Sequence, residues 1–126
     1  MGVHLSLDDR DVAEPPRFLG LVDSGAWRTL LPRAIAVQLG IDDLLVADDE
    51  SGEGVGITFP TWSYPPGLMA QIFLDEPELP LWGTPFRLEP GFASIDFLPL
   101  LGRADFFRAF VVRFDEPGQV VELDQI

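Results

Sequence analysis

Residues 19–32 constrain this chain more than any other stretch. There an apolar segment runs directly into Asp23-Ser24-Gly25, and the chain turns apolar again just before Pro32. A carboxylate at the end of a buried strand is costly unless it is hydrogen-bonded or paired. Ser24 can donate a hydrogen bond to a neighbouring oxygen, and Gly25 lets another backbone approach closely or allows a positive φ. The pattern predicts an acid held in one place in a dry site.

The tripeptide also occurs in ordinary turns, because all three residue types favour them. Its flanks carry a resemblance to a known family. Leu21-Val22-Asp23-Ser24-Gly25-Ala26, followed by Thr29-Leu30-Leu31-Pro32, resembles the active-site segment of the retropepsin-like aspartic proteases. Leu100-Leu101-Gly102-Arg103 resembles the second landmark of that family, two apolar residues and a glycine before an arginine. The two landmarks span most of the chain, and we expect a single-domain member of bacterial type.

Peptide hydrolysis by carboxylates needs two acids close together, one ionised and one protonated. Two carboxylates about 3 Å apart cannot both ionise, so they share a proton. This chain has one Asp-Ser-Gly only, so the second acid must come from a second copy across a two-fold axis. The resemblance thus implies a homodimeric aspartic endopeptidase acting on a peptide or protein substrate. Asp23 is then catalytic, and Ser24 and Gly25 fix its geometry.

The resemblance assigns further residues around this acid. The glycine-rich turn at residues 51–57 can form a hairpin tip with positive φ. It corresponds to the flap that covers substrate, and an ordinary hairpin turn is the alternative. The implied substrate-binding residues are Ala26, Gly54, Val55 and Gly56, and the implied structural residues are Gly102 and Arg103. No metal or cofactor is expected.

Two residues depart from the family pattern. Retroviral members have an acid two residues after the motif glycine, which pairs with the landmark arginine, and this chain has Trp27 there. Arg103 then needs another partner, either Asp105 or an acid of the second subunit. Ala104 stands where the family has Asp or Asn, and Asp105 can take over as helix cap. An alternative is therefore a catalytically inactive dimerisation or peptide-binding module of the same fold. A third is a monomeric β-barrel that binds a small ligand.

Alternating apolar residues and turn signals predict mostly short strands. The expected strands are 3–7, 17–22, 67–74 (buried on both faces), 92–97 and a hairpin of 110–114 with 119–123. Short helices are expected over 32–40 and 104–110, and a proline-rich loop carrying Trp82 over 75–85. The prediction is an all-β, retropepsin-like closed β-barrel with one short C-terminal helix, forming a single domain over residues 1–126.

Composition excludes several classes of function. The chain has no cysteine, which rules out disulfides, thiolate zinc sites and a cysteine nucleophile. A formal net charge of −13 would repel phosphate backbones, so nucleic-acid binding is not expected. The acidic run at residues 42–53 lacks the ligand spacing of a calcium loop, and a solvated loop is predicted instead.

The sequence also bears on location. No apolar run approaches the roughly 18 residues needed to span a membrane, and the N-terminal residues do not read as a signal peptide. We expect a cytoplasmic protein with no membrane partner. His4, the only histidine, is predicted to be a strand-edge residue rather than a catalytic base.

Overall fold

The computed structural model describes residues 2–8, 15–49, 52–54, 57–75, 78, 80–94 and 97–126. The described chain is mostly β, as predicted. Its strands are β1 Gly2–Asp8, β2 Arg17–Val22, β3 Leu30–Pro32, β4 Val46–Ala47, β5 Gly52–Gly54, β6 Ile57–Phe59, β7 Trp62–Ser63, β8 Leu68–Phe73, β9 Leu81–Leu88, β10 Gly91–Ala93, β11 Leu100–Leu101, β12 Phe110–Asp115 and β13 Val120–Gln125. Its helices are α1 Arg33–Leu39, the 3-10 turn η1 Asp42–Leu44, and α2 Phe106–Ala109.

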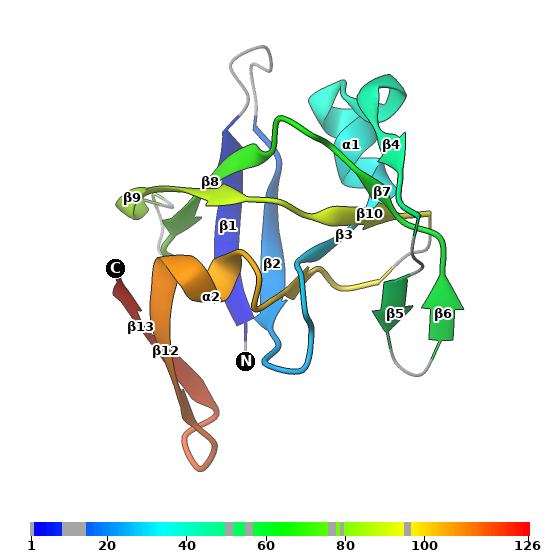
Figure 1. The fold of residues 1–126 in the computed structure, drawn as a ribbon. Helices are drawn as coiled ribbons and strands as arrows, with labels where there is room; N and C mark the ends of the chain where they lie inside the picture. Colours follow the sequence, from blue (N-terminus) through cyan, green and yellow to red (C-terminus); the bar gives the residue numbers. More distant parts are fainter. Residues whose placement is uncertain are drawn as a thin grey trace.

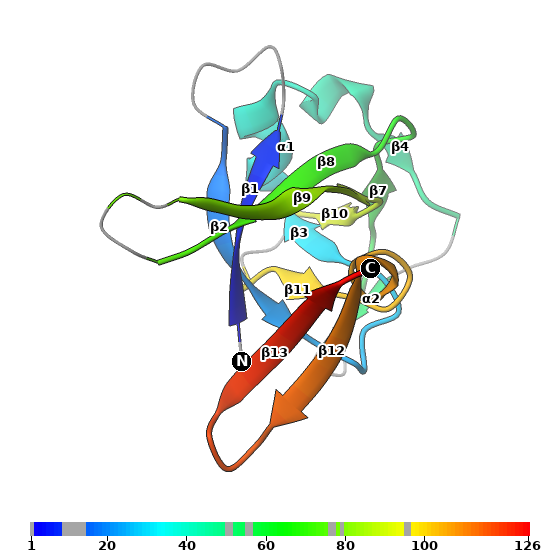
Figure 2. The ribbon, with the colours of Figure 1, turned by 90° about the vertical axis from the view of Figure 1, so that its left-hand side faces the viewer.

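One large sheet organises the molecule (Figures 1 and 2). Its strand order is β4-β7-β10-β3-β11-β2-β1-β8-β9. The short strand β11 lies between β2 and β3, parallel to the first and antiparallel to the second. Because β2 and β3 are joined by the segment that contains Asp-Ser-Gly, β11 is inserted between the two arms of that segment. Closure of this sheet into a barrel stays a prediction.

The core explains why this arrangement is held firmly. Side chains of one strand face alternate ways, and Val3, Leu5 and Leu7 of β1 are all buried. The helix α2 packs through an aromatic cluster in which the rings of Phe86, Phe106 and Phe110 have centroids 4.9 to 5.9 Å apart. Such ring pairs add to the stabilisation from burial. The strand β11 and the helix α2 therefore rest on packed aromatic and aliphatic side chains.

Several predicted elements are present within a residue or two of their expected bounds. They are β1, β2, α1, α2 and the hairpin of β12 with β13. The helix α1 ends at Gly40, whose φ of 73° is the left-handed conformation that glycine adopts without strain. In the hairpin, Arg113 Nη1 lies 2.6 Å from Asp124 Oδ2. That hydrogen bond and the charge of Asp124 raise the pKa of Arg113 above its usual range.

The predicted loop over residues 75–85 is wrong in its second half. Strand β9 begins at Leu81 and includes Trp82 and Pro85. It lies at the edge of the sheet, and a proline is tolerated there because one side of an edge strand has no neighbouring strand to bond with. Gly83 has a φ of 71°, and the register between β8 and β9 shifts in this region. An irregular edge strand therefore replaces the loop.

Two other strand predictions need correction. Strand β8 is not buried on both faces, since Met69 is exposed while Leu68 and Ala70 are buried. The strand predicted over 92–97 is shorter, because β10 ends at Ala93; residues 95 and 96 lie outside the described part of the chain. His4 pairs with Leu19 of β2, and the pairing of β1 with β8 begins only at Leu5.

The acidic segment is less solvated than predicted. Asp42 forms an ion pair with Arg33, at 2.6 Å between Nε and Oδ1. Asp48 is half-buried and bound by several donors that are described below. Within the residues that the structure describes, no group of three or more His, Asp or Glu side chains could hold a metal ion. No helix among the described residues is long and apolar enough to cross a membrane.

Candidate active site

Asp23 is the first residue after β2, and three hydrogen bonds fix it. Its N–H donates to the carbonyl of Leu101 at 3.0 Å, which ties it to β11. Its own carbonyl accepts from Ala26 N at 3.1 Å, closing a tight turn. Its Oδ1 accepts from Gly25 N at 2.8 Å. The carboxylate is thus fixed on one side by the glycine of the motif.

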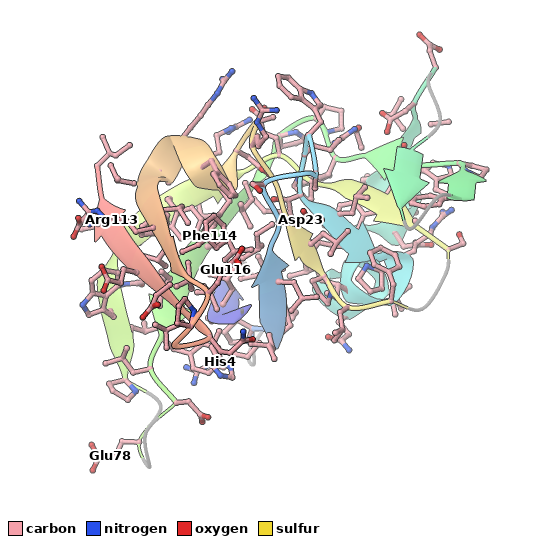
Figure 3. The ribbon with its side chains drawn as sticks, turned by 90° about the horizontal axis from the view of Figure 1, so that it is seen from below. His4, Asp23, Glu78, Arg113, Phe114 and Glu116 are labelled. Carbon is pink, nitrogen blue, oxygen red and sulfur yellow. The ribbon has the colours of Figure 1, made fainter. Side chains whose placement is uncertain are left out.

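In a single chain this carboxylate is not in a dry place. Asp23 is half-buried, and Ser24 and Gly25 are exposed. The prediction of a dry site is therefore wrong for the isolated chain, because Asp23 is only partly covered and the next two residues are open to water. Figure 3 shows Asp23 near the middle of the face seen from below.

The second landmark supports the loop that carries Asp23. A Cβ on Gly102 would overlap the backbone of Arg28, so only glycine fits at this crossing. The N–H of Arg103 donates to the carbonyl of Ala26 at 3.0 Å, and the N–H of Ala104 donates to that of Trp27 at 2.7 Å. The two landmarks are therefore joined backbone to backbone. Gly102 and the backbone of Arg103 thus lie at this junction, and their assignment as structural residues stays a prediction.

Asp105 anchors the same assembly from inside. Its side chain is buried, and it caps α2 by accepting from Phe106 N at 2.9 Å. The same oxygen accepts from the hydroxyl of Thr29 at 2.7 Å, and its other oxygen accepts from Glu89 N at 3.1 Å. The cap followed from the sequence, because Asp commonly precedes a helix. The bonds to Thr29 and Glu89 had no sequence signal.

Arg103 forms no ion pair with Asp105, one of the two partners expected from sequence, and an acid of a second subunit stays a prediction. Its guanidinium carbon lies 5.9 Å from the ring centroid of Trp27, a cation–π distance. It forms no ion pair with any acid of the described residues. Trp27, which stands where the resembled family has an acid, is therefore near the Arg103 guanidinium in this chain. Trp27 is 66% exposed, which is unusual for so large an apolar side chain.

The predicted flap corresponds to a hairpin. Strands β5 and β6 pair antiparallel as a separate two-stranded sheet, with Gly54 opposite Ile57. Figure 1 shows this hairpin pointing to the same lower side of the molecule as the loop after β2. Val55 and Gly56 lie outside the described residues. The substrate-binding roles of Ala26, Gly54, Val55 and Gly56 stay predictions.

The sequence matches no protein-family model, and no curated protein matches it. Among solved structures, the chain is similar to EIAV protease complexed with the inhibitor HBY-793. The two share 20% sequence identity over 81% of this chain and 80% of that chain, with a TM-score of 0.45. The fold resembles that of a retroviral protease. This likeness concerns the fold alone, so a function has to be argued from the residues around Asp23.

Proposed function

We propose that this chain is an aspartic endopeptidase whose active site forms when two copies bring their Asp23 carboxyls together. One observation carries the proposal. Each chain presents a carboxylate on a fixed turn at the end of a strand, with Oδ1 bound to Gly25 N at 2.8 Å and the side chain still partly exposed. A single copy offers one such acid, and a two-fold axis supplies the second.

The paired carboxyls would divide the chemistry between them. The ionised carboxyl takes a proton from water, whose oxygen forms a bond to the peptide carbonyl carbon. The protonated carboxyl donates to the carbonyl oxygen, which becomes a hydroxyl of the tetrahedral intermediate. The C–N bond then breaks as the nitrogen receives the proton that the first carboxyl took from water. The second carboxyl recovers its proton from the hydroxyl as the carbonyl re-forms in the acid product. Gly25 N–H keeps the carboxyl of Asp23 from turning away during these steps.

The substrate would lie between the Asp23 turn and the β5–β6 hairpin of each copy. Gly54, Val55 and Gly56 would cover it, and Ala26 would contact it beside the reacting bond. An unstructured peptide or protein segment fits this role, because a folded segment presents its peptide bonds less openly. The partner in the assembly is a second copy of this chain.

Hydrolysis of an unstructured protein between about pH 4 and 7 tests the proposal. Asp23→Asn keeps the size and the bond from Gly25 and removes the acid, so the rate should fall at least roughly a hundredfold, as expected for loss of an acid–base group. Asp43→Asn, an exposed acid of η1, is the matched control and should keep the wild-type rate. Unchanged hydrolysis by Asp23→Asn would contradict the proposal.

One observation favours a second candidate, an inactive module that dimerises or binds peptides. The ion pair of active retroviral members is replaced here by Arg103 over Trp27, at 5.9 Å. Such a module would bind unstructured peptides with equal affinity in wild type and Asp23→Asn and would cleave none. Turnover by the wild type decides between the two.

A further inference from the structure

A closed polar cluster lies where the β5–β6 hairpin leaves the main sheet. We call it the stem cluster, and it consists of the side chains of Arg28, Asp48, Thr61 and Ser63. One oxygen of Asp48, Oδ2, lies 3.2 Å from Arg28 Nη1 and accepts from the hydroxyl of Thr61 at 2.7 Å. The other oxygen, Oδ1, accepts from the hydroxyl of Ser63. Ser63 in turn accepts from Arg28 Nη2 at 3.0 Å, which closes the ring.

The cluster marks a break in the ladder of the hairpin. On the side of the main sheet, β4 pairs with β7, and Asp48 N donates to the carbonyl of Thr61 at 3.0 Å. Beyond it β5 and β6 pair again, from Gly52 opposite Phe59. The register differs by two residues between the two ladders, because Ala47 pairs with Trp62 in the first and Gly52 pairs with Phe59 in the second. Among the described residues, the ladder of the main sheet therefore does not run on into the β5–β6 hairpin.

The side chains of the cluster supply that link. The Arg28 and Asp48 side chains are only 30% and 20% exposed, and charges so far removed from water require partners. Every oxygen of the Asp48 carboxylate has a donor, and Ser63 both donates and accepts. A fully satisfied ring of this kind holds its members in one arrangement.

The other end of the link is the loop that carries Asp23. Arg28 belongs to that loop, and its backbone lies against Gly102 so closely that a Cβ there would overlap it. The next residue, Thr29, is bound to buried Asp105. Arg28 is thus rigid at its backbone and reaches out to the hairpin stem with its guanidinium.

We propose that Arg28 and Asp48 are positioning residues that set the β5–β6 hairpin relative to Asp23. The catalytic consequence rests on the proposed function, whereas the effect on the hairpin does not. Neither residue need touch substrate. They act by holding the hairpin at a constant distance from Asp23, and the substrate would lie between the two.

Hydrogen exchange under native conditions tests this directly. In Asp48→Asn the amides of β5 and β6 should exchange about tenfold faster, because a charge-assisted bond is lost at the stem. Amides of β1 and β8 should keep their wild-type rates. Asp42→Asn, which breaks the comparable half-buried pair with Arg33, should leave β5 and β6 unchanged. Equal acceleration of all strands, or none in the hairpin, would overturn the proposal.

A double-variant comparison adds a readout that a merely structural role would not give. Arg28→Gln, Asp48→Asn and the double variant should raise KM by about three- to tenfold with kcat changed less than twofold, as for lost binding that is equal in ground and transition states. The double variant should be no worse than the more affected single variant, because both remove one interaction. Additive effects would contradict coupling. A wild type that hydrolyses nothing would refute the proposed function, and the exchange data would still decide this inference.

Discussion

Replacing Asp105 should destabilise the fold more than replacing any exposed acid. Its carboxylate accepts from Thr29 N, the Thr29 hydroxyl and Phe106 N on one oxygen, and from Glu89 N on the other. Hydrogen bonds to charged groups contribute about 1.5–3 kcal/mol each, although bonds that share an acceptor do not add in full. The helix cap alone is worth about 1 kcal/mol.

We therefore expect Asp105→Ala to lower the free energy of unfolding by about 3–5 kcal/mol, as when one partner of a buried charged group is removed. That is a large share of the roughly 5–15 kcal/mol that stabilises a typical domain. Asp105→Asn should cost less, about 1–3 kcal/mol, because its amide can keep the bonds to Oδ1 while its NH2 faces the N–H of Glu89.

Urea unfolding followed by circular dichroism measures these losses at one fixed protein concentration. With a slope of about 1–3 kcal/mol per molar urea, the midpoint for Asp105→Ala should fall by about 1–5 M. Asp115→Ala is the control, since Asp115 accepts one bond from Gly118 N at 3.2 Å in an exposed turn. It should cost less than about 1 kcal/mol. Equal midpoint shifts for the two variants would refute the reasoning.

Three more predictions concern the loop and its partner. Gly102→Ala should lower the free energy of unfolding by at least about 3 kcal/mol, measured by thermal or urea unfolding, because its Cβ would meet the Arg28 backbone; a wild-type midpoint would contradict the close crossing. Trp27→Ala should weaken the proposed dimer at least about tenfold in sedimentation equilibrium, because a two-fold axis at Asp23 would bring this exposed ring close to the interface, whereas Trp82→Ala on edge strand β9 should not. If paired Asp23 carboxyls share a proton, the dimer binds more protons than the separated chains, so dimer affinity should fall as pH rises from about 4 to 8. At high salt Asp23→Asn should lose that dependence, and a pH profile equal to that of the wild type would show that the carboxyls are not paired.

The sequence was informative where the structure depends on local chemistry. The alternation of apolar and polar residues predicted β1 and β2, and Pro32 and Gly40 predicted where α1 begins and ends. The Asp23 turn was predictable in part, because the bonds from Gly25 N and Ala26 N are local, whereas the bond to Leu101 joins it to a distant strand. The cap of α2 by Asp105 was predictable for the same reason.

What the sequence did not predict depends on contacts between distant segments. Strand β9 has a glycine and a proline, which are typical of a loop, and it is a strand because β8 offers it an edge to pair with. The acidic segment around Asp48 has the composition of a solvated loop. Asp48 is nevertheless bound by Arg28 and Ser63, which belong to other segments. The contact of Arg103 with Trp27 was missed because the arginine was expected to form an ion pair, whereas it lies near an aromatic ring.

Mixing wild-type and Asp23→Asn chains tests the central claim, that two Asp23 carboxyls form one active site. After the subunits have exchanged, the hydrolysis rate is measured at constant total protein concentration. Random pairing of an equal mixture leaves about one quarter of the dimers with both carboxyls. The account predicts a rate about one quarter of that of the pure wild type. A rate of about one half would mean that each chain works with its own acid alone, and would contradict the account.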